Sequence, residues 1–128
     1  MAARFDLVTL DARNTEELAR FWSAALSLQE VEREDDGRWI VLGDASPGRR
    51  RLGLQRITGL TDEPAVFEGG RKARLHLDLA CEPDEFDSEM ARLIGLGARP
   101  LRAARRESYG SIATMADPEG NVFDLCAY

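Results

Sequence analysis

The only histidine of the chain, His76, lies two residues from Asp78 in the alternating segment 74–79, which reads Arg-Leu-His-Leu-Asp-Leu. An imidazole can ligate a metal or carry a proton near neutral pH, and a nearby carboxylate can serve in either process. Successive side chains of a strand point to opposite faces. If the leucines of this segment cover a helix, His76 and Asp78 point together to the other face of the sheet.

The same alternation places further polar side chains on that open face. Asp124 alternates with apolar residues in 122–125, so it points away from the core. Asp6 alternates with Phe and Leu, and we expect it at the position of the first half that matches His76. Gln55 lies near the position that matches Asp124. Two carboxylates and one imidazole that converge suit a divalent metal with mixed nitrogen and oxygen preference, such as Zn, Ni, Mn or Fe.

Each of these residues also has a simpler interpretation. His76 is either a metal ligand or general acid/base, or a hydrogen-bonded residue that lines a dry cleft. Asp124 is either the base that removes a proton next to a polarised carbonyl, or a carboxylate paired with Arg74 or Arg4. Residue types and spacing leave both choices open.

The elements that position these residues occur twice along the chain. Segments 4–10 and 73–80 are predicted strands, and each leads into an amphipathic helix. Turn sequences at 44–48 and 117–120 precede closing strands in both halves. We therefore predict an α+β fold of two tandem βαβββ modules, about 4–58 and 73–128, joined by the turn-rich segment 59–72. They form a half-open, barrel-like and mostly antiparallel sheet within a single domain, 1–128.

Local signals fix several boundaries. Asn14 and Glu17 have the spacing of a capping box, and the helix that follows should end near Leu26. Asp36-Gly37 predicts a type I′ hairpin turn. Pro83 marks the start of the second helix, and Gly97 marks its end.

Composition excludes several classes of protein. The 128 residues, 44% hydrophobic, are enough for one domain with a substantial core. A net charge of −6 argues against a nucleic-acid partner. No apolar run is long enough to cross a membrane, and no signal peptide is evident, so we expect a cytoplasmic protein without a membrane partner. The two cysteines are expected to be free thiols. A small-molecule ligand or substrate is the partner that remains.

The chain resembles the vicinal oxygen chelate superfamily of glyoxalase, bleomycin-resistance and dioxygenase proteins over nearly its whole length, and its glyoxalase-like branch in particular. The motifs that carry this resemblance are Leu-Ala-Arg-Phe-Trp at 18–22, Arg-Leu-His-Leu-Asp-Leu at 74–79, Ala-Arg-Leu with Leu-Gly-Ala at 91–98, and Ala-Asp-Pro-Glu-Gly-Asn at 116–121. The resemblance implies a metal that chelates two neighbouring substrate oxygens. Matched by motif, its ligands would be Asp6, Gln55, His76 and Asp124.

Two functions follow from this resemblance. One is a metal-dependent lyase or isomerase of glyoxalase type, with Asp124 and His76 as catalytic residues. The other is a metal-free binding protein of the drug-sequestering kind, whose acidic cleft would favour a cationic guest. Extradiol dioxygenase chemistry is set aside because it needs two histidines and the chain has one. The superfamily also implies a homodimer, in which a partner covers the apolar surface that a half-open barrel leaves.

Overall fold

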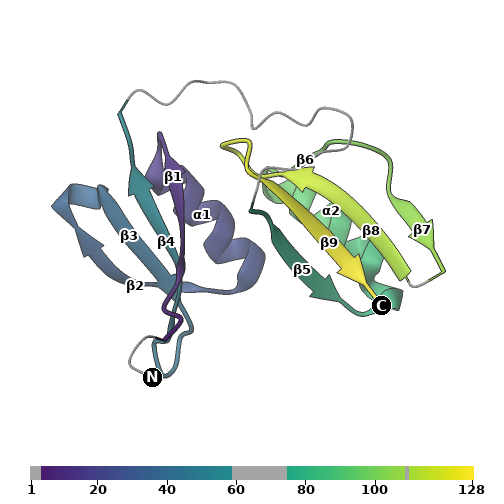
Figure 1. Ribbon diagram of the computed structural model, residues 1–128, viewed down its shortest axis with the longest axis horizontal. Helices are drawn as coiled ribbons and strands as arrows, with labels where there is room; N and C mark the ends of the chain where they lie inside the picture. Colours follow the sequence, from purple (N-terminus) through teal and green to yellow (C-terminus); the bar gives the residue numbers. More distant parts are fainter. Residues whose placement is uncertain (1–3, 59–74, 109) are drawn as a thin grey trace. The chain divides into compact units, whose positions relative to one another are not determined.

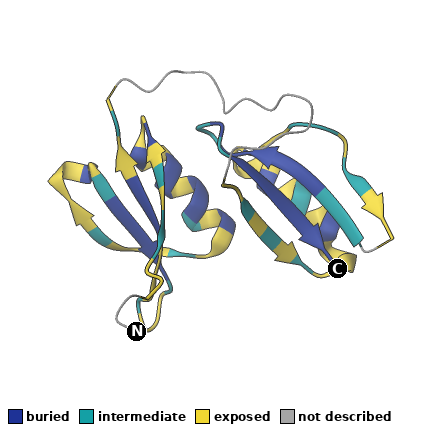
Figure 2. Ribbon diagram, viewed as in Figure 1, coloured by how far each residue is buried: buried dark blue, intermediate teal, exposed yellow. Residues whose placement is uncertain are grey.

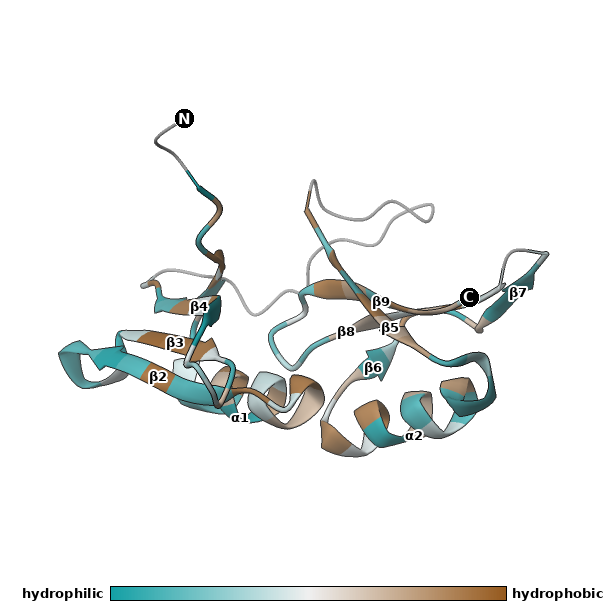
Figure 3. Ribbon diagram, turned by 90° about the horizontal axis from the view of Figure 1, so that it is seen from below, coloured by the Kyte–Doolittle hydropathy of each residue, from teal (hydrophilic) through white to brown (hydrophobic). Residues whose placement is uncertain are grey.

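The computed structural model describes residues 4–58, 75–108 and 110–128, which form two compact units, Met1–Thr61 and Asp62–Tyr128 (Figure 1). Each unit has one α-helix against one face of its own sheet (Figure 3). The first contains β1 Val8–Ala12, α1 Thr15–Leu26, β2 Gln29–Glu34, the 3-10 turn η1 Asp35–Gly37, β3 Trp39–Gly43 and β4 Arg50–Arg56. The second contains β5 Leu77–Cys81, η2 Pro83–Glu85, α2 Phe86–Leu96, β6 Arg99–Pro100, β7 Arg105–Glu107, β8 Gly110–Ala116 and β9 Val122–Ala127.

The predicted α+β class and the two tandem modules are confirmed. The sheets have the open strand orders β1-β4-β3-β2 and β5-β9-β8-β6, and β7 also pairs with β8. In each sheet the first and last strands of the module pair in parallel, and the other pairs are antiparallel. Buried residues concentrate on β3, β8 and β9 (Figure 2). The segment 59–72, expected to join the halves, lies outside the described residues, and the single domain over 1–128 stays a prediction.

The first helix follows its local signals. The Asn14 side chain accepts a hydrogen bond from the backbone N–H of Glu17 at 3.1 Å, and α1 ends at Leu26, as expected. Leu18, Phe21 and Trp22 recur at helical spacing and are buried against the sheet. The rings of Phe21 and Trp22 meet edge to face with centroids 5.0 Å apart. Most of the stability of this helix therefore comes from its apolar face.

The hairpin predicted at Asp36-Gly37 is present between β2 and β3, but its turn is longer than a two-residue type I′ turn. Asp35, Asp36 and Gly37 have positive φ values of 51°, 54° and 85° and form η1. Asp and Gly tolerate this left-handed conformation better than most residues. The turn chemistry was therefore indicated correctly, although its exact type was not.

The first strand begins later than expected. The prediction of 4–10 directs Phe5 into the core, but β1 spans Val8–Ala12 and Phe5 is 80% exposed. A parallel strand exists only where a partner supplies hydrogen bonds, and β4 pairs with β1 from Val8↔Leu52 onward. Leu52 and Leu54 are buried, which fixes the position of β4 in the sheet. The residues that pair with this part of β4, from Val8 onward, are therefore the ones that form β1.

The second module differs from the first in one strand. The single strand predicted near 98–102 is replaced by β6 and β7, which both pair with β8. The pairing with β8 continues through Pro100 to Leu101, whose backbone N–H donates to the carbonyl of Thr114 at 3.0 Å, and it resumes with β7 at Arg105↔Ile112. Gly97 ends α2 with φ 125°, and Pro83 lies in the preceding 3-10 turn, as their positions indicated.

Gly95 is an exposed helical glycine whose replacement should stabilise the protein. A Cβ placed on it would meet no atom within 4 Å, and it lies inside α2. Because alanine loses less backbone entropy in a helix than glycine does, we expect Gly95→Ala to raise the free energy of unfolding by up to about 1 kcal/mol. Urea denaturation measures this change, and a decrease would contradict the described helix.

Candidate functional site

Three polar side chains of the second unit meet on the face of the sheet opposite α2. Asp78 of β5 and Asp124 of β9 are register partners in a parallel pair, and His76 immediately precedes β5. The imidazole Nε2 of His76 lies 3.2 Å from Oδ1 of Asp78 and 3.7 Å from Oδ2 of Asp124. One ligand atom from each residue lies within 4.8 Å of the other two. We call these three residues the His/Asp/Asp cluster.

The inner carboxylate of the cluster is held in place by a hydroxyl. Thr114 lies opposite Asp124 in the antiparallel pair of β8 and β9. Its Oγ1 donates a hydrogen bond to Oδ1 of Asp124 at 2.7 Å, and both residues are buried. The other oxygen of the carboxylate, Oδ2, is the one that faces His76. Such an outer hydrogen bond fixes the orientation of a ligating carboxylate.

Exposure increases from one end of the cluster to the other. The side chain of Asp124 is 8% exposed, that of His76 is 32% exposed, and that of Asp78 is 62% exposed. The cluster therefore has a fixed, buried end and an end that a dissolved ion or small molecule can reach.

The donor set fits a divalent transition metal. Metal–ligand bonds of about 2.0 to 2.2 Å in a tetrahedral site place neighbouring ligand atoms about 3.4 Å apart. The distances from Nε2 of His76 to the two carboxylate oxygens, 3.2 and 3.7 Å, lie on either side of that value. One imidazole and two carboxylates are ligands for Zn, Mn, Ni or Fe. Three protein ligands also leave coordination positions for a substrate, as catalytic metal sites require.

The other two expected ligands, Asp6 and Gln55, belong to the first unit. Asp6 precedes β1, and its Oδ2 lies 3.4 Å from a guanidinium nitrogen of Arg50. Gln55 is an exposed residue of β4 opposite Trp39. Ligation by Asp6 and Gln55 stays a prediction.

The strand register corrects the expected matching of the two halves. Val8 pairs with Leu52 at the start of β1, as Leu77 pairs with Phe123 at the start of β5. The next pairs along the strands are Thr9 with Gly53 and Asp78 with Asp124. The residue before the strand is Leu7 in the first unit and His76 in the second. When the first residues of β1 and β5 are aligned, Leu7 rather than Asp6 corresponds to His76, and Gly53 rather than Gln55 corresponds to Asp124.

The equivalent face of the first unit is filled by an indole ring. A Cβ on Gly53 would lie 2.5 Å from Cη2 of Trp39 and 2.9 Å from Oγ1 of Thr9. Trp39 Nε1 donates a hydrogen bond to Glu32 at 2.9 Å, which holds the ring in place. The position that carries a carboxylate in the second unit therefore has no room for one in the first.

This close contact predicts the effect of Gly53→Ala. A Cβ at 2.5 Å from the indole forces Trp39 or the backbone to move, and overpacking of this kind costs about 1 to 3 kcal/mol. We expect a corresponding decrease in the free energy of unfolding, measured by urea denaturation, with Gly95→Ala as the matched glycine control. An unchanged stability would show that Trp39 does not pack over Gly53.

Asp78 is the cluster member that the ligand prediction omitted. The alternation in 74–79 had placed it on the same face as His76, so the signal was present in the sequence. Arg74, the alternative partner of Asp124, lies outside the described residues. Both cysteines, Cys81 and Cys126, are free thiols, as expected. Burial raises the pKa of the Cys81 thiol above its ordinary value, which disfavours the nucleophilic thiolate.

Comparison with known families identifies the family to which the whole chain belongs. The family model described as "Glyoxalase-like domain" matches residues 7–126. This chain belongs to the glyoxalase-like domain family. The resemblance noted from its motifs is thus confirmed. No curated protein matches the chain. Among the described residues, no helix of this glyoxalase-like domain has the length and apolar character to span a membrane.

Solved structures share the fold at low sequence identity. The glyoxalase-like domain is similar to the fosfomycin resistance protein FosX from Listeria monocytogenes, with TM-score 0.74, 15% identity, and coverage of 100% of this chain and 95% of that one. A glyoxalase-related enzyme from Fulvimarina pelagi has TM-score 0.71 and 22% identity, with 98% and 88% covered. A glyoxalase/bleomycin resistance protein/dioxygenase family enzyme from Burkholderia phytofirmans PsJN has TM-score 0.70 and 19% identity, with 95% and 96% covered. These similarities establish the fold.

Proposed function

We propose that this glyoxalase-like domain is a divalent-metal-dependent lyase or isomerase that acts on small substrates with two neighbouring oxygens. The observation that carries this proposal is the convergence of His76, Asp78 and Asp124, whose ligand atoms lie within 4.8 Å of one another. Membership of the glyoxalase-like domain family supports it. Zn, Mn, Ni and Fe are the ions that this donor set would hold.

The residues of the cluster have different tasks in this proposal. A bound divalent ion would act as a Lewis acid on the substrate oxygens. Asp124 would hold the ion through Oδ2, the oxygen that faces His76, while Thr114 keeps Oδ1 in place. When a substrate oxygen replaces Oδ2 as a ligand, this oxygen is free to take the proton from the neighbouring substrate carbon. His76 binds through Nε2, the nitrogen that faces both carboxylates. Asp78, the more exposed carboxylate, would hold the ion through Oδ1 and adds negative charge that attracts a cation.

The alternative is a metal-free protein that binds a small cationic compound. The exposure of Asp78 favours it, because an accessible carboxylate beside a second one attracts an organic cation as well as a metal ion. In that case the cluster would bind its ligand without turnover.

Metal analysis of the purified protein separates the two functions. After incubation with Zn, Mn, Ni or Fe and dialysis, we expect about one equivalent of metal per chain, which His76→Ala should lose. Asp6→Asn and Gln55→Ala, measured alongside, test whether the first unit contributes ligands. A protein that retains none of these metals but binds cationic aromatic compounds would contradict the lyase or isomerase and favour sequestration.

Replacement of the hydroxyl that holds Asp124 should weaken metal binding without removing a ligand. Thr114→Val preserves side-chain shape but loses the hydrogen bond to Oδ1 of Asp124. Loss of such an outer partner lowers metal affinity by about 10- to 100-fold. Titration with a chromophoric metal chelator measures this change, and Thr114→Ser, which keeps the hydroxyl, should restore most of the affinity. Equal affinity of all three proteins would exclude a positioning role for Thr114.

The cytoplasmic location and the homodimer also remain proposals. Large apolar side chains that are exposed in the single chain support the dimer, since a second copy would cover some of them. They include Phe5, Leu75 and Tyr128, which are 80%, 81% and 69% exposed. Sedimentation velocity at micromolar concentration tests the dimer, and a strictly monomeric protein would contradict it.

A further inference from the structure

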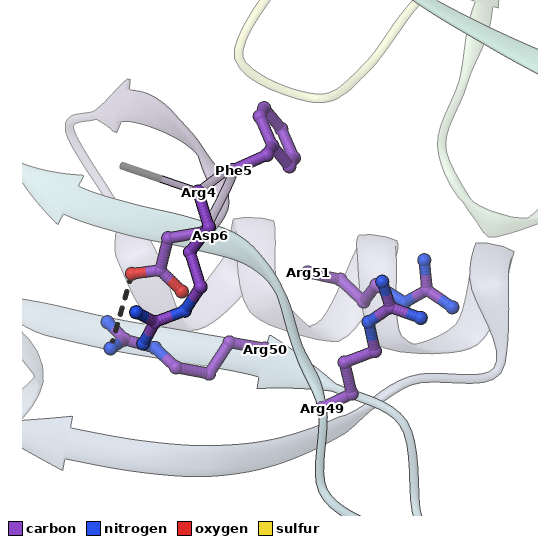
Figure 4. Close-up of a pocket in the computed structure, with 6 residues that line it drawn as sticks. All are labelled: Arg4, Phe5, Asp6, Arg49, Arg50 and Arg51. Carbon is purple, nitrogen blue, oxygen red and sulfur yellow. Dashed lines mark ion pairs between the residues drawn. The ribbon is translucent and has the colours of Figure 1, made fainter. Parts of the chain in front are cut away.

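Four arginines gather around one pocket of the first unit, in a chain whose net charge is −6. The pocket has a volume of about 380 Å³, and its lining comes from the N-terminal segment and the start of β4. The lining residues are Arg4, Phe5, Asp6, Arg49, Arg50 and Arg51 (Figure 4). Its charged residues comprise four cations and one anion.

The carboxylates near this pocket neutralise only part of its positive charge. Asp6 lies 3.4 Å from Arg50, which also lies 3.4 Å from Glu32 outside the lining. Arg51 pairs with Asp44 at 3.1 Å. Within residues 4–58, 75–108 and 110–128, no carboxylate forms an ion pair with Arg4 or Arg49. Guanidinium groups brought together in this way repel one another, and a bound anion would relieve that repulsion.

We propose that this arginine pocket binds the phosphate group of a small phosphorylated molecule. Guanidinium groups form paired, charge-assisted hydrogen bonds with phosphate oxygens, and several around one pocket match a polyvalent anion. In Figure 4 the guanidinium groups form two pairs: those of Arg4 and Arg50 lie beside Asp6, and those of Arg49 and Arg51 extend to the other side, away from that carboxylate. This pocket belongs to the first unit and the His/Asp/Asp cluster to the second, and the proposal does not depend on the proposed metal chemistry.

Phe5 defines the second part of the ligand. Its ring is 80% exposed and points away from the guanidinium groups in Figure 4, so it offers an apolar surface at the edge of the pocket. A ligand with a ring or other apolar group attached to its phosphate would cover Phe5 while the arginines bind the anion. Inorganic phosphate and pyrophosphate have no apolar group, so they would contact the arginines but not Phe5.

Asp6 acts in this arrangement as an internal competitor. Its carboxylate occupies Arg50 and places a negative charge in the pocket lining. Removal of that charge should therefore strengthen anion binding, whereas removal of a guanidinium should weaken it. A general effect of net charge would give the same signs, so a matched arginine variant in the second unit is needed to assign the loss to the pocket.

Calorimetric titration with pyrophosphate and with phenyl phosphate tests the proposal. We expect Arg49→Gln to weaken the binding of both by about tenfold, and Asp6→Asn to strengthen it severalfold. Phe5→Ala should weaken phenyl phosphate alone. Arg106→Gln, which removes an exposed arginine paired with Asp87 in the second unit, is the matched control and should change nothing. Circular dichroism confirms that each variant is folded.

Three outcomes would overturn the proposal. The first is no heat of binding for either probe, and the second is an equal loss in Arg49→Gln and Arg106→Gln. The third is binding only to vesicles of anionic lipid or to DNA, which would make the pocket part of a macromolecular contact. None of these outcomes tests the proposed metal site, which is tested separately by the metal content of the purified protein.

Discussion

His76→Ala is expected to abolish the stabilisation of this protein by divalent metal. A ligand present at 100 times its dissociation constant stabilises the state that binds it by about 2.7 kcal/mol. The wild-type protein should gain that stability with Zn, because His76 is the nitrogen ligand common to both carboxylate contacts of the cluster. In the variant two carboxylates remain, and the gain should disappear. Thermal denaturation with and without metal measures the difference.

A matched control separates loss of the site from loss of the fold. Asp84→Asn removes an exposed carboxylate of η2 in the same unit but outside the cluster, so its metal-dependent shift should equal that of the wild type. Without metal, His76→Ala should unfold close to the wild-type temperature, since the His76 side chain is partly exposed. A metal-dependent shift that persists in His76→Ala would refute the proposed ligand set.

Asp117→Ala is expected to cause the largest loss of stability, about 3 kcal/mol. Asp117 is 2% exposed, and its Oδ1 accepts the backbone N–H groups of Glu119 and Asn121 at 2.9 Å each. Its Oδ2 accepts the side-chain amide of Asn121 at 2.8 Å. Alanine leaves these donors without their acceptor. Urea denaturation followed by tryptophan fluorescence measures the free energy of unfolding.

Asp117→Asn provides the comparison, because an amide oxygen can still accept the two backbone N–H groups. It should lose less stability than Asp117→Ala, and equal losses would show that these hydrogen bonds do not account for the effect. The turn also joins β8 to β9, the strands that bring Thr114 and Asp124 together. Variants at Asp117 should therefore reduce metal affinity in proportion to how far they loosen this pair of strands.

Much of the fold could be predicted because its signals are local. The cap of α1 by Asn14, the glycine end of α2 at Gly97 and the turn at Asp117 each depend on interactions within a few residues. The period of apolar residues likewise fixes which face of each helix is buried. The sequence also brought His76 and Asp78 to one face, because alternation within one strand needs no partner.

The start of a strand and its register are different, because they depend on another segment far along the chain. Phe5 is as apolar as Leu10, yet only Leu10 has a β4 partner with which it can join the sheet. With the starts of β1 and β5 aligned, Leu7 rather than Asp6 corresponds to His76, and a shift of one residue in an extended segment reverses the face of a side chain.

The sequence by itself determined the fold class, the order of the elements, the turns and the face on which His76 lies, since short-range sterics, hydrogen bonds and periodicity encode these features. Only the tertiary structure decided that Asp124 lies close to His76 and Asp78. It likewise decided that Thr114 donates a hydrogen bond to the Asp124 carboxylate. It also decided that Trp39 fills the equivalent position over Gly53. These outcomes depend on which strands pair and in what register, and long-range burial of apolar residues selects that pairing.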